Sequence, residues 1–428
     1  MPLLQPPETV LQITRVLEDA GHQAWCVGGA VRDALLGIPN LDWDLTTSAT
    51  PQQVRRLFKR TVPVGIEFGT IGVLDSDNVM HEVTTFRADV ETDGRHAVVR
   101  FGGSLDEDLA RRDFTINAIA YSPSRDELRD PFGGQQDMAA RTLRCVGVAK
   151  DRMREDRLRA LRAIRFGSRF GFTIEPATWE AIRLSAPYLA RLSPERVQQE
   201  IVKTMKQVAR PSVAFRMWRE SGALAALVPG LAGITDTELL ALDHLRLPLL
   251  ARRPQRLQTR LAGLFSGARP GTVLAMMKAL RFSNADVSWI GGLVERWHDL
   301  GRVMKAELMQ VQPPSDAVLR RWAGATGRTR LAPILRIADA HWWAERESGR
   351  PAPTRERVES VYRRAVRIAY RDPVEVSDLA VDGNDLSAAG ITGKRLGDTL
   401  RGLLQYVLED PARNTRDALL RRAVEETA

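Results

Sequence analysis

Two aspartates separated by one residue, Asp42 and Asp44, are the strongest candidates for chemistry in this sequence. They lie at a short apolar stretch that predicts a β-strand over Trp43–Thr46. Because side chains alternate along a strand, both carboxylates would lie on one face, roughly 7 Å apart along the backbone. Two converging anions repel unless a cation lies between them, and Mg²⁺ prefers carboxylate and phosphate oxygens. The pair therefore predicts a magnesium site, although a surface turn can carry the same short pattern.

Two adjacent glycines, Gly28 and Gly29, follow a β-type run and precede a helical pattern over Ala30–Leu36. Backbone N–H groups beside such glycines, and at the start of the helix that follows, can approach a phosphate closely. Arg32 would point from the first helical turn towards the same phosphates. We expect a phosphate site beside the aspartates; an ordinary Gly-rich bend between strand and helix is the alternative.

A third acid, Glu82, lies inside another β-type run, where an unpaired carboxylate would be costly to bury. It could complete the metal site, or it could pair with an arginine such as Arg87. The sequence leaves both interpretations open.

A first arginine motif combines guanidinium donors with a carboxylate in Arg111–Ala118. Arg112 could bind a phosphate, and Asp113 could accept a hydrogen bond from a ribose hydroxyl, which distinguishes ribose from deoxyribose. A helix start with a local ion pair is the alternative.

A second arginine motif predicts one helix over Arg154–Phe170, on which four charged residues would form a slanted row. The row consists of Asp156, Arg159, Arg162 and Arg165. Residues 141–169 contain nine arginines and one lysine against three acids, a local net charge of +7. A row of almost one sign repels itself unless an anion arrives, so it favours contacts to the triphosphate and base of a nucleotide. A solvated, ion-paired helix face is the alternative.

The chain changes character near residue 150, and this change indicates its fold class. Short β-type runs bounded by turns occur before that point, and helical spacing prevails after it. The predicted strands are Ala24–Val27, Trp43–Thr46, Gly69–Leu74, Met80–Phe86, Ala97–Gly102 and Ile116–Tyr121. We therefore expect an α+β protein, with an N-terminal mixed sheet covered by helices and a long helical remainder.

Composition narrows the class of protein further. With 44% hydrophobic and 27% charged residues among 428, a wholly disordered or fibrous chain is excluded. A net charge of +9 favours a polyanionic partner such as nucleic acid, although arginine-rich proteins without such a partner are common. The two cysteines, Cys26 and Cys145, exclude a disulfide framework and a Cys-rich zinc site. No apolar run reaches about 18 residues, so we expect no membrane association and a cytoplasmic location.

The order of the motifs resembles one enzyme family. Gly-Gly-Ala-Val-Arg-Asp, Leu-Asp-Trp-Asp-Leu, Arg-Arg-Asp-Phe-Thr-Ile-Asn-Ala, Glu-Asp-x-x-Arg and Pro-Glu-Arg follow one another within residues 26–200. This series is similar to that of the class II tRNA nucleotidyltransferases (CCA-adding enzymes) and bacterial poly(A) polymerases. The resemblance implies a polymerase-β-type nucleotidyltransferase head at 1–147 and a helical neck for base recognition at 148–207. It further implies a helical body with a degenerate HD-like region at 208–312 and a helical, tRNA-binding tail at 313–428.

The resemblance also implies a reaction: template-independent addition of C, C and A to the tRNA 3′ end from CTP and ATP, with release of pyrophosphate. Asp42 and Asp44 would hold two Mg²⁺ ions, one activating the tRNA 3′ hydroxyl and one steadying the triphosphate. Gly28, Gly29 and Arg32 would hold the phosphates.

The arginine motifs would then recognise the nucleotide itself. By the same resemblance, Arg112 and Asp113 recognise the ribose, while Asp156 and Arg159 present a protein edge that pairs with cytosine or adenine. Both bases show an exocyclic amine beside a ring acceptor, whereas guanine and uracil invert that pattern. Two further arginines of the row would contact the nucleotide: Arg162 and Arg165.

The sequence leaves the subgroup within the family open. The stretch Ala88–Ser104, with Asp93-Gly94-Arg95-His96, resembles the flexible loop used for the ATP step, although a plain hairpin is the alternative. An enzyme that adds only A, or a poly(A) polymerase, stays possible, as does a catalytically silent RNA-binding protein. His298-Asp299 lacks the ligand spacing of an HD hydrolase. In the tail, Gly390–Gly397 carries two cations at a helix start and could contact an RNA backbone.

Overall fold

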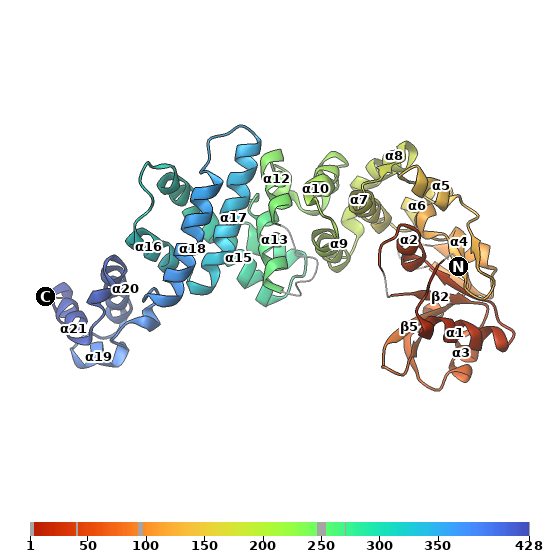
Figure 1. Cartoon of the computed structure of the whole chain (residues 1–428), viewed down its shortest axis with the longest axis horizontal. Coiled ribbons are helices and arrows are strands. Elements are labelled where there is room, and N and C mark those ends of the chain that lie inside the picture. Colours follow the sequence, from red (N-terminus) through yellow and green to blue (C-terminus); the bar gives the residue numbers. More distant parts are fainter. Residues whose placement is uncertain (1–3, 40–41, 93–96, 246–253, 270, 428) are drawn as a thin grey trace. The chain divides into compact units, whose positions relative to one another are not determined.

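The computed structural model describes residues 4–39, 42–92, 97–245, 254–269 and 271–427. The chain divides into two compact units (Figure 1). Unit 1 comprises Met1–Glu200 and Met217–Leu227, and unit 2 comprises Ile201–Arg216 and Val228–Ala428. The division into head, neck, body and tail stays a prediction.

A seven-stranded mixed sheet organises unit 1, in the order β3-β4-β5-β2-β1-β8-β9. Its neighbouring strands are antiparallel except for β2 and β5, which run parallel. The strands are β1 Ala24–Val27, β2 Asp44–Thr47, β3 Thr61–Gly65, β4 Thr70–Leu74, β5 Met80–Thr85, β8 Ala120–Ser122 and β9 Glu127–Arg129. Two smaller pairs are β6 Arg87–Thr92 with β7 Ala97–Phe101, antiparallel, and β10 Thr142–Leu143 with β11 Thr173–Ile174, parallel. The predicted mixed sheet is confirmed, but β11 means that the expected all-helical neck contains a short strand.

Helices pack around this sheet and continue beyond it in unit 1. They are α1 Glu8–Asp19, α2 Gly29–Leu35, α3 Pro51–Leu57, α4 Leu105–Ala110, α5 Gly134–Ala139, α6 Ala149–Glu155, α7 Leu158–Phe170, α8 Pro176–Ser185 and α11 Ala223–Leu227. Short 3₁₀ turns are η1 Ile66–Phe68, η2 Thr115–Asn117 and η3 Ala186–Arg191. One core cluster between the sheet and α4 includes Trp25, Val27, Phe86 and Leu109. Burial of these side chains fixes the strands that carry the candidate site.

Unit 2 is built from helices (Figure 1). Two helices, α9 Pro194–Gln207 and α10 Pro211–Glu220, contain residues of both units. The others are α12 Asp236–His244, α13 Pro254–Phe265, α14 Val273–Ala279, α15 Asn284–Met309, α16 Asp316–Thr326, α17 Arg328–Glu347, α18 Arg355–Arg371, α19 Gly383–Ala388, α20 Lys394–Glu409 and α21 Arg416–Thr427, with 3₁₀ turns η4 Pro229–Leu231, η5 Val376–Asp378 and η6 Pro411–Arg413. Helices α13, α15 and α17 pack on one another. The helical remainder predicted from residue spacing is thereby confirmed.

Three predicted elements differ from the structure. The strand expected over Ile116–Tyr121 is instead the turn η2 followed by β8, because Asn117 is drawn into side-chain hydrogen bonds. The strand expected over Trp43–Thr46 begins only at Asp44, so Asp42 precedes it. The single helix expected over Arg154–Phe170 is interrupted between α6 and α7, where the backbone of Asp156 is extended.

The two cysteines lie apart in the core of unit 1. Cys26 and Cys145 are free thiols, and both are buried. Burial raises the thiol pKa of both, that of Cys145 to about 12. Neither thiol is therefore disposed to ionise or react near neutral pH.

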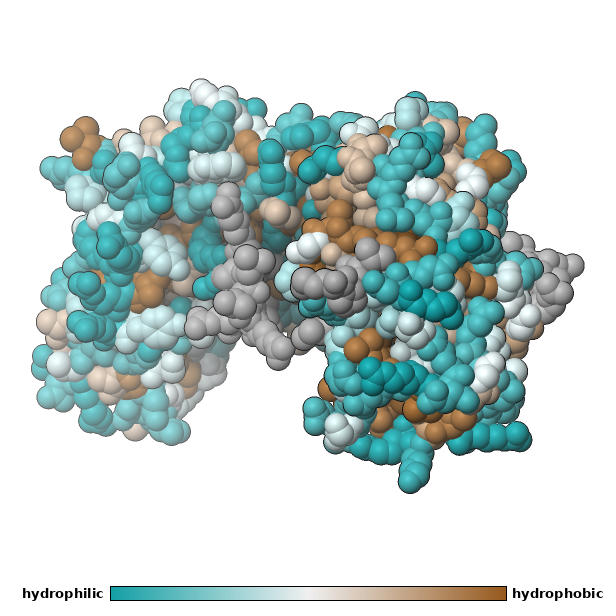
Figure 2. All heavy atoms as spheres, turned by 45° about the vertical axis from the view of Figure 1, so that its right-hand side comes forward, coloured by the Kyte–Doolittle hydropathy of each residue, from teal (hydrophilic) through white to brown (hydrophobic). Residues whose placement is uncertain are grey.

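The surface is mainly hydrophilic on the face drawn in Figure 2, with smaller hydrophobic patches between. Among the described residues, no helix combines the length and the apolar character that crossing a membrane requires.

Candidate active site in unit 1

Strand register brings the predicted carboxylates together. Asp44 is the first residue of β2 and pairs with Val27 of β1. On the other side, Leu45 pairs with Val83 of the parallel strand β5. Asp44 and Glu82 each precede these partners by one residue, so their side chains lie side by side on one face of the sheet. Two of the expected acids are thus neighbours through sheet pairing that sequence spacing alone does not reveal.

The raised pKa of Asp44 reflects its burial and the negative charges beside it. Its pKa is raised to about 6, first by burial and then by the charges of Asp42 and Glu82. The guanidinium of Arg112 acts in the opposite direction. Asp42 and Glu82 are both exposed, whereas Asp44 is half-buried. The cluster therefore carries more negative charge than its surroundings balance.

These carboxylates fit a divalent cation. A cation beside Asp44 would relieve the repulsion that raises its pKa, and carboxylate oxygens are the ligands that hard cations prefer. Within the described part of the chain, no three His, Cys, Asp or Glu residues converge closely enough to hold a metal ion by themselves. A site with few protein ligands is typical of metals that also bind substrate phosphates.

Gly28 separates the carboxylates from an arginine. Its φ of +74° favours glycine, and a Cβ there would lie 3.0 Å from Nη1 of Arg112 and 3.8 Å from Oδ2 of Asp44. Arg112 is anchored by Asp108, whose Oδ2 lies 3.3 Å from Nη2. The predicted site residues Gly28, Asp44 and Arg112 therefore converge. The guanidinium of Arg112 and the carboxylate of Asp44 both lie beside Gly28.

Arg32 is buried rather than open to solvent, its side chain being 4% exposed. Its guanidinium donates to Oδ1 of Asp33 at 2.6 and 2.8 Å and to Oδ1 of Asn117 at 2.5 Å. It also packs against the rings of Phe166 and Phe170 on α7. A Cβ on Gly29 would lie 3.5 Å from Nη2 of Arg32, so this arginine adjoins the glycine pair while bracing α2 against α7.

Asp113 is also buried and fully engaged. Its Oδ1 accepts from the backbone N–H of Phe114 and from Nδ2 of Asn117, and its Oδ2 accepts from Nε of Arg162 at 2.8 Å. Burial alone would raise the pKa of Asp113, but Arg162 and Asn117 outweigh it, so the pKa lies below its usual value. The two predicted nucleotide-binding residues Asp113 and Arg162 therefore form one ion pair.

Asp156 interrupts the arginine helix. It lies between α6 and α7, its backbone is extended, and its Oδ1 accepts from the backbone N–H of Leu158. Aspartate favours this position because its side chain satisfies an N–H that the new helix leaves unpaired. Its Oδ2 accepts from Nη2 of Arg196 on α9 at 2.7 Å. The prediction that Asp156 belongs to the same helix as Arg159 is therefore wrong, although the two still lie close in sequence.

The arginine row is paired with acids that lie mostly outside the stretch 141–169, within unit 1. Each arginine of α7 has a carboxylate partner within 3.3 Å. The pairs are Arg159–Glu155, Arg162–Asp113, Arg165–Glu200 and Arg169–Asp33. Arg159 also donates to the carbonyls of Arg152 and Arg111. Ion pairing, rather than an arriving anion, offsets the repulsion along the row.

Sequence reasoning missed Asn117, Arg196 and Glu200 as members of this site. Asn117 and Arg196 lie inside motifs quoted above, but their types alone gave no reason to expect a bridging role. Glu200 is 1% exposed beside Arg165, and only the packing of α9 on α7 reveals that pair.

Other predicted features lie outside this cluster. Strands β6 and β7 pair antiparallel, and Asp93, Gly94, Arg95 and His96 lie outside the described residues. His298 lies within α15, partly buried, and burial lowers its pKa.

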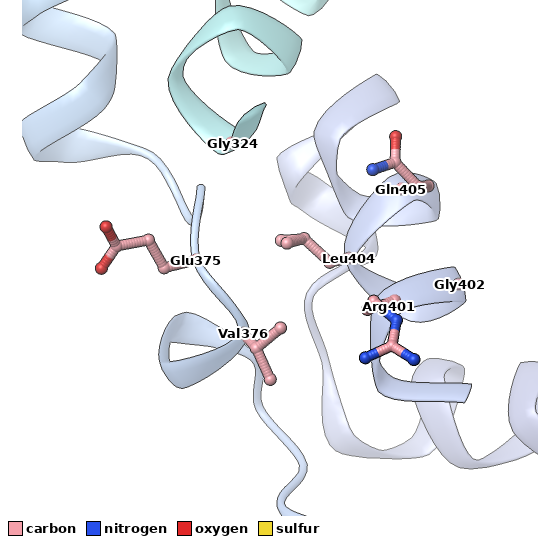
Figure 3. Close-up of a pocket in the computed structure, with 7 residues that line it drawn as sticks. All are labelled: Gly324, Glu375, Val376, Arg401, Gly402, Leu404 and Gln405. Atoms are coloured by element: carbon pink, nitrogen blue, oxygen red, sulfur yellow. The ribbon is translucent and has the colours of Figure 1, made fainter. Parts of the chain in front are cut away.

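In the tail, Lys394 and Arg395 are exposed at the start of α20, as the sequence predicts. A hollow of about 490 Å³ lies nearby in unit 2, between α20, the segment at Glu375 and the end of α16 (Figure 3). Its two charged side chains are already engaged. Arg401 pairs with Asp398, and Glu375 accepts from the backbone N–H of Arg328. The hollow contains none of the predicted catalytic residues.

A mixed sheet that presents clustered carboxylates beside a Gly-Gly turn and a guanidinium is the arrangement of a nucleotidyltransferase. The "Poly A polymerase head domain" family model matches residues 24–144, and "Probable RNA and SrmB- binding site of polymerase A" matches residues 171–234. The CCA-adding enzyme of Latilactobacillus sakei is 34% identical over 418 residues, which is 96% of each chain. That of Bacillus velezensis is 44% identical over 63% of this chain and 66% of its own. The chain belongs to the CCA-adding enzyme family.

Solved structures agree with this assignment. The crystal structure of Bacillus stearothermophilus CCA-adding enzyme in complex with CTP has a TM-score of 0.78 and 31% identity, covering 99% of this chain and 98% of that one. Thermotoga maritima CCA-adding enzyme complexed with tRNA, at 20% identity and a TM-score of 0.65, shares the fold.

Proposed function

We propose that this protein adds C, C and A in turn to the 3′ end of tRNA, using CTP and ATP without a nucleic-acid template. The similarity to CCA-adding enzymes along almost the whole chain is the observation that carries the proposal. The clustered carboxylates, Arg112 beside Gly28, and Asp156 beside Arg159 are the residues proposed to carry this reaction. We place the reaction in the cytoplasm.

In each addition, the 3′ oxygen of the tRNA forms a bond to the α-phosphorus, and the bond from that phosphorus to the bridging oxygen breaks. The hydroxyl proton is lost and pyrophosphate leaves. Asp42 and Asp44 are proposed to hold Mg²⁺, with Glu82 adding negative charge beside them. When bound, the metal neutralises phosphate charge and makes the attacking hydroxyl easier to deprotonate.

Phosphate binding is assigned to Gly28, Gly29, Arg32 and Arg112. Arg112 lies beside both Gly28 and Asp44, so its charge lies where a triphosphate would meet the carboxylates. Arg32 connects α2 to Asn117 and to the ring of Phe170 on α7, and it lies close to Gly29. Only glycine at position 28 leaves room for this approach, because a side chain would meet Arg112.

Base selection is assigned to Asp156 and Arg159. A carboxylate acceptor beside a guanidinium donor matches the exocyclic amine and ring acceptor that cytosine and adenine share. Guanine and uracil would leave buried groups unpaired, which costs more than the bond itself gains. Arg196 fixes Asp156, and Arg111 and Glu155 fix Arg159, so the edge is rigid. Ribose recognition falls to Arg112 and Asp113, with Arg162 and Arg165 supporting the nucleotide from α7.

Binding of tRNA away from its 3′ end is assigned to unit 2. Lys394 and Arg395 are exposed at the start of α20, where they can contact a phosphate backbone without selecting a sequence.

Incorporation assays on three truncated tRNAs test this function. Substrates ending before the first C, after the first C and after both would each be given CTP, ATP or both with Mg²⁺. We expect extension by the missing nucleotides and then arrest. Incorporation of A alone would indicate an A-adding enzyme, long A tails a poly(A) polymerase, and no incorporation an RNA-binding protein without activity.

A further inference from the structure

Asn117 joins the phosphate side and the ribose side of the site. It ends the turn η2 and is 6% exposed. Its Oδ1 accepts from Nη1 of Arg32, and its Nδ2 donates to Oδ1 of Asp113 at 2.9 Å. Its backbone carbonyl lies 3.4 Å from Nη1 of Arg112. One residue therefore contacts three that are assigned to the nucleotide.

The chemistry of its two neighbours fixes the orientation of this amide. A guanidinium offers only donors and a carboxylate only acceptors, so Oδ1 must face Arg32 and Nδ2 must face Asp113. Because both ends are buried, neither bond can be exchanged for water at low cost. An asparagine meets both requirements at once, and an aspartate at the same position cannot.

Asp113 depends on this amide for its position. Its Oδ2 is held by Arg162, and its Oδ1 by the N–H of Phe114 and by Asn117. The contact with Asn117 is also one cause of the low pKa of Asp113. If the amide were lost, Oδ1 would lose one of its two donors, and the carboxylate could rotate about its bond to Cβ.

We propose that Asn117 is a positioning residue that sets the selection of ribonucleotides over deoxyribonucleotides by orienting Asp113. This inference rests on the proposed function, in which Asp113 contacts the ribose. Asn117 acts through its side chain on Asp113, whereas it reaches Arg112 only through its backbone. The side chain also accepts from Arg32, so a substitution that keeps this acceptor, such as Asn117→Asp, leaves the contacts to both Arg32 and Arg112 in place and changes sugar selection more than phosphate binding.

The test compares CTP with 2′-deoxy-CTP on tRNA ending before CCA, using the full-length protein. Asn117→Asp keeps an acceptor for Arg32 but sets a second carboxylate against Asp113. We expect the ratio of kcat/KM for CTP over 2′-deoxy-CTP to fall about tenfold, chiefly through loss of activity with CTP. Asn117→Ser, which adds no charge and is smaller, should lower the ratio in the same direction by less. If either variant turns over slowly, the ratio of the equilibrium dissociation constants of the two nucleotides should shift in the same direction.

A matched control is Asn414→Asp. Asn414 also uses both ends of its amide, accepting from the N–H of Ala380 and donating to the carbonyl of Asp378 in unit 2. We expect this variant to lose thermal stability, while its ratio of kcat/KM for CTP over 2′-deoxy-CTP stays unchanged.

The outcomes separate the inference from the function. An unsubstituted protein that incorporates no cytidine would overturn the proposed function. If Asp113→Ala abolishes selection while Asn117→Asp retains it, or if both substrates lose activity equally in Asn117→Asp, the role of Asn117 is overturned.

Discussion

The carboxylate cluster at β2 and the arginine row of α7 differ in how far their charges are neutralised by neighbouring residues. Around Asp44, burial and the charges of neighbouring acids raise the pKa of its carboxyl group, and the guanidinium of Arg112 lowers it. Along α7, every arginine of the row has a carboxylate within 3.3 Å. The first region keeps negative charge that its surroundings do not balance, whereas the second is neutralised by its own acids. A run of one charge in the sequence therefore does not by itself mark the place where a ligand of opposite charge binds.

Replacing Asp44 should have the largest effect on activity. Asp44→Asn should lower kcat for cytidine addition by at least about a thousandfold, because it removes a metal ligand. Its melting temperature should be unchanged or higher, since the substitution removes repulsion at a half-buried acid. Labelled CTP incorporation and a thermal melt measure the two effects. Asp77→Asn, at an exposed acid, is the control, and equal activity in both variants would contradict the assignment.

Breaking the balance along α7 should mainly affect stability. Glu200→Gln leaves Arg165 buried without its charged partner, and we expect the free energy of unfolding to fall by about 3 kcal/mol. Glu180→Gln breaks an exposed pair with Arg183 and should change it by less than about 0.5 kcal/mol. Urea unfolding of both variants checks this difference. Similar losses would show that α7 does not depend on its buried pair.

Releasing Asp156 should affect base choice. Arg196→Ala removes the donor to Oδ2 of Asp156, and we expect kcat/KM for CTP to fall about tenfold, which corresponds to about 1.4 kcal/mol. Incorporation of UTP should rise relative to CTP, because the base-facing edge is less rigid. Arg183→Ala, at an exposed arginine, should change neither value. Unchanged base selection in Arg196→Ala would speak against the role of Asp156.

The smallest predicted effect concerns pH. The pKa of Asp44 is about 6 in the folded protein against 3.8 for the ordinary group, so the stability contributed by its protonated form is lost as the pH rises through 6. Without divalent cations, stability relative to Asp44→Asn should fall by about 1 kcal/mol between pH 5 and pH 7. Added Mg²⁺ should raise the melting temperature more at pH 7 than at pH 5, and equal shifts would argue against a cation at Asp44.

The strands and helices that depend on the local spacing of apolar and turn residues could be predicted from the sequence. The strand Ala24–Val27, the helix Pro194–Gln207 and the change to helices near residue 150 are confirmed because turn residues and apolar periodicity define them. The helix break at Asp156 was missed because the apolar spacing continues across it, although its carboxylate accepts from the first backbone N–H of the next helix.

The candidate site was predicted by residue type and family resemblance, but its internal contacts were not. The pairing of Asp33 with Arg169 joins residues 136 positions apart, and that of Asp113 with Arg162 joins residues 49 apart. Such partners come together only through the packing of α7 against α2 and against the segment at Asp113, which no local pattern predicts.

The two buried cysteines make this chain convenient for labelling. Because Cys26 and Cys145 are shielded and hard to ionise, a cysteine introduced at an exposed position would react with a maleimide fluorophore far faster than either native thiol. Dyes attached at one exposed residue in each unit could then test, by energy transfer, whether the separation of the units changes as successive nucleotides are added.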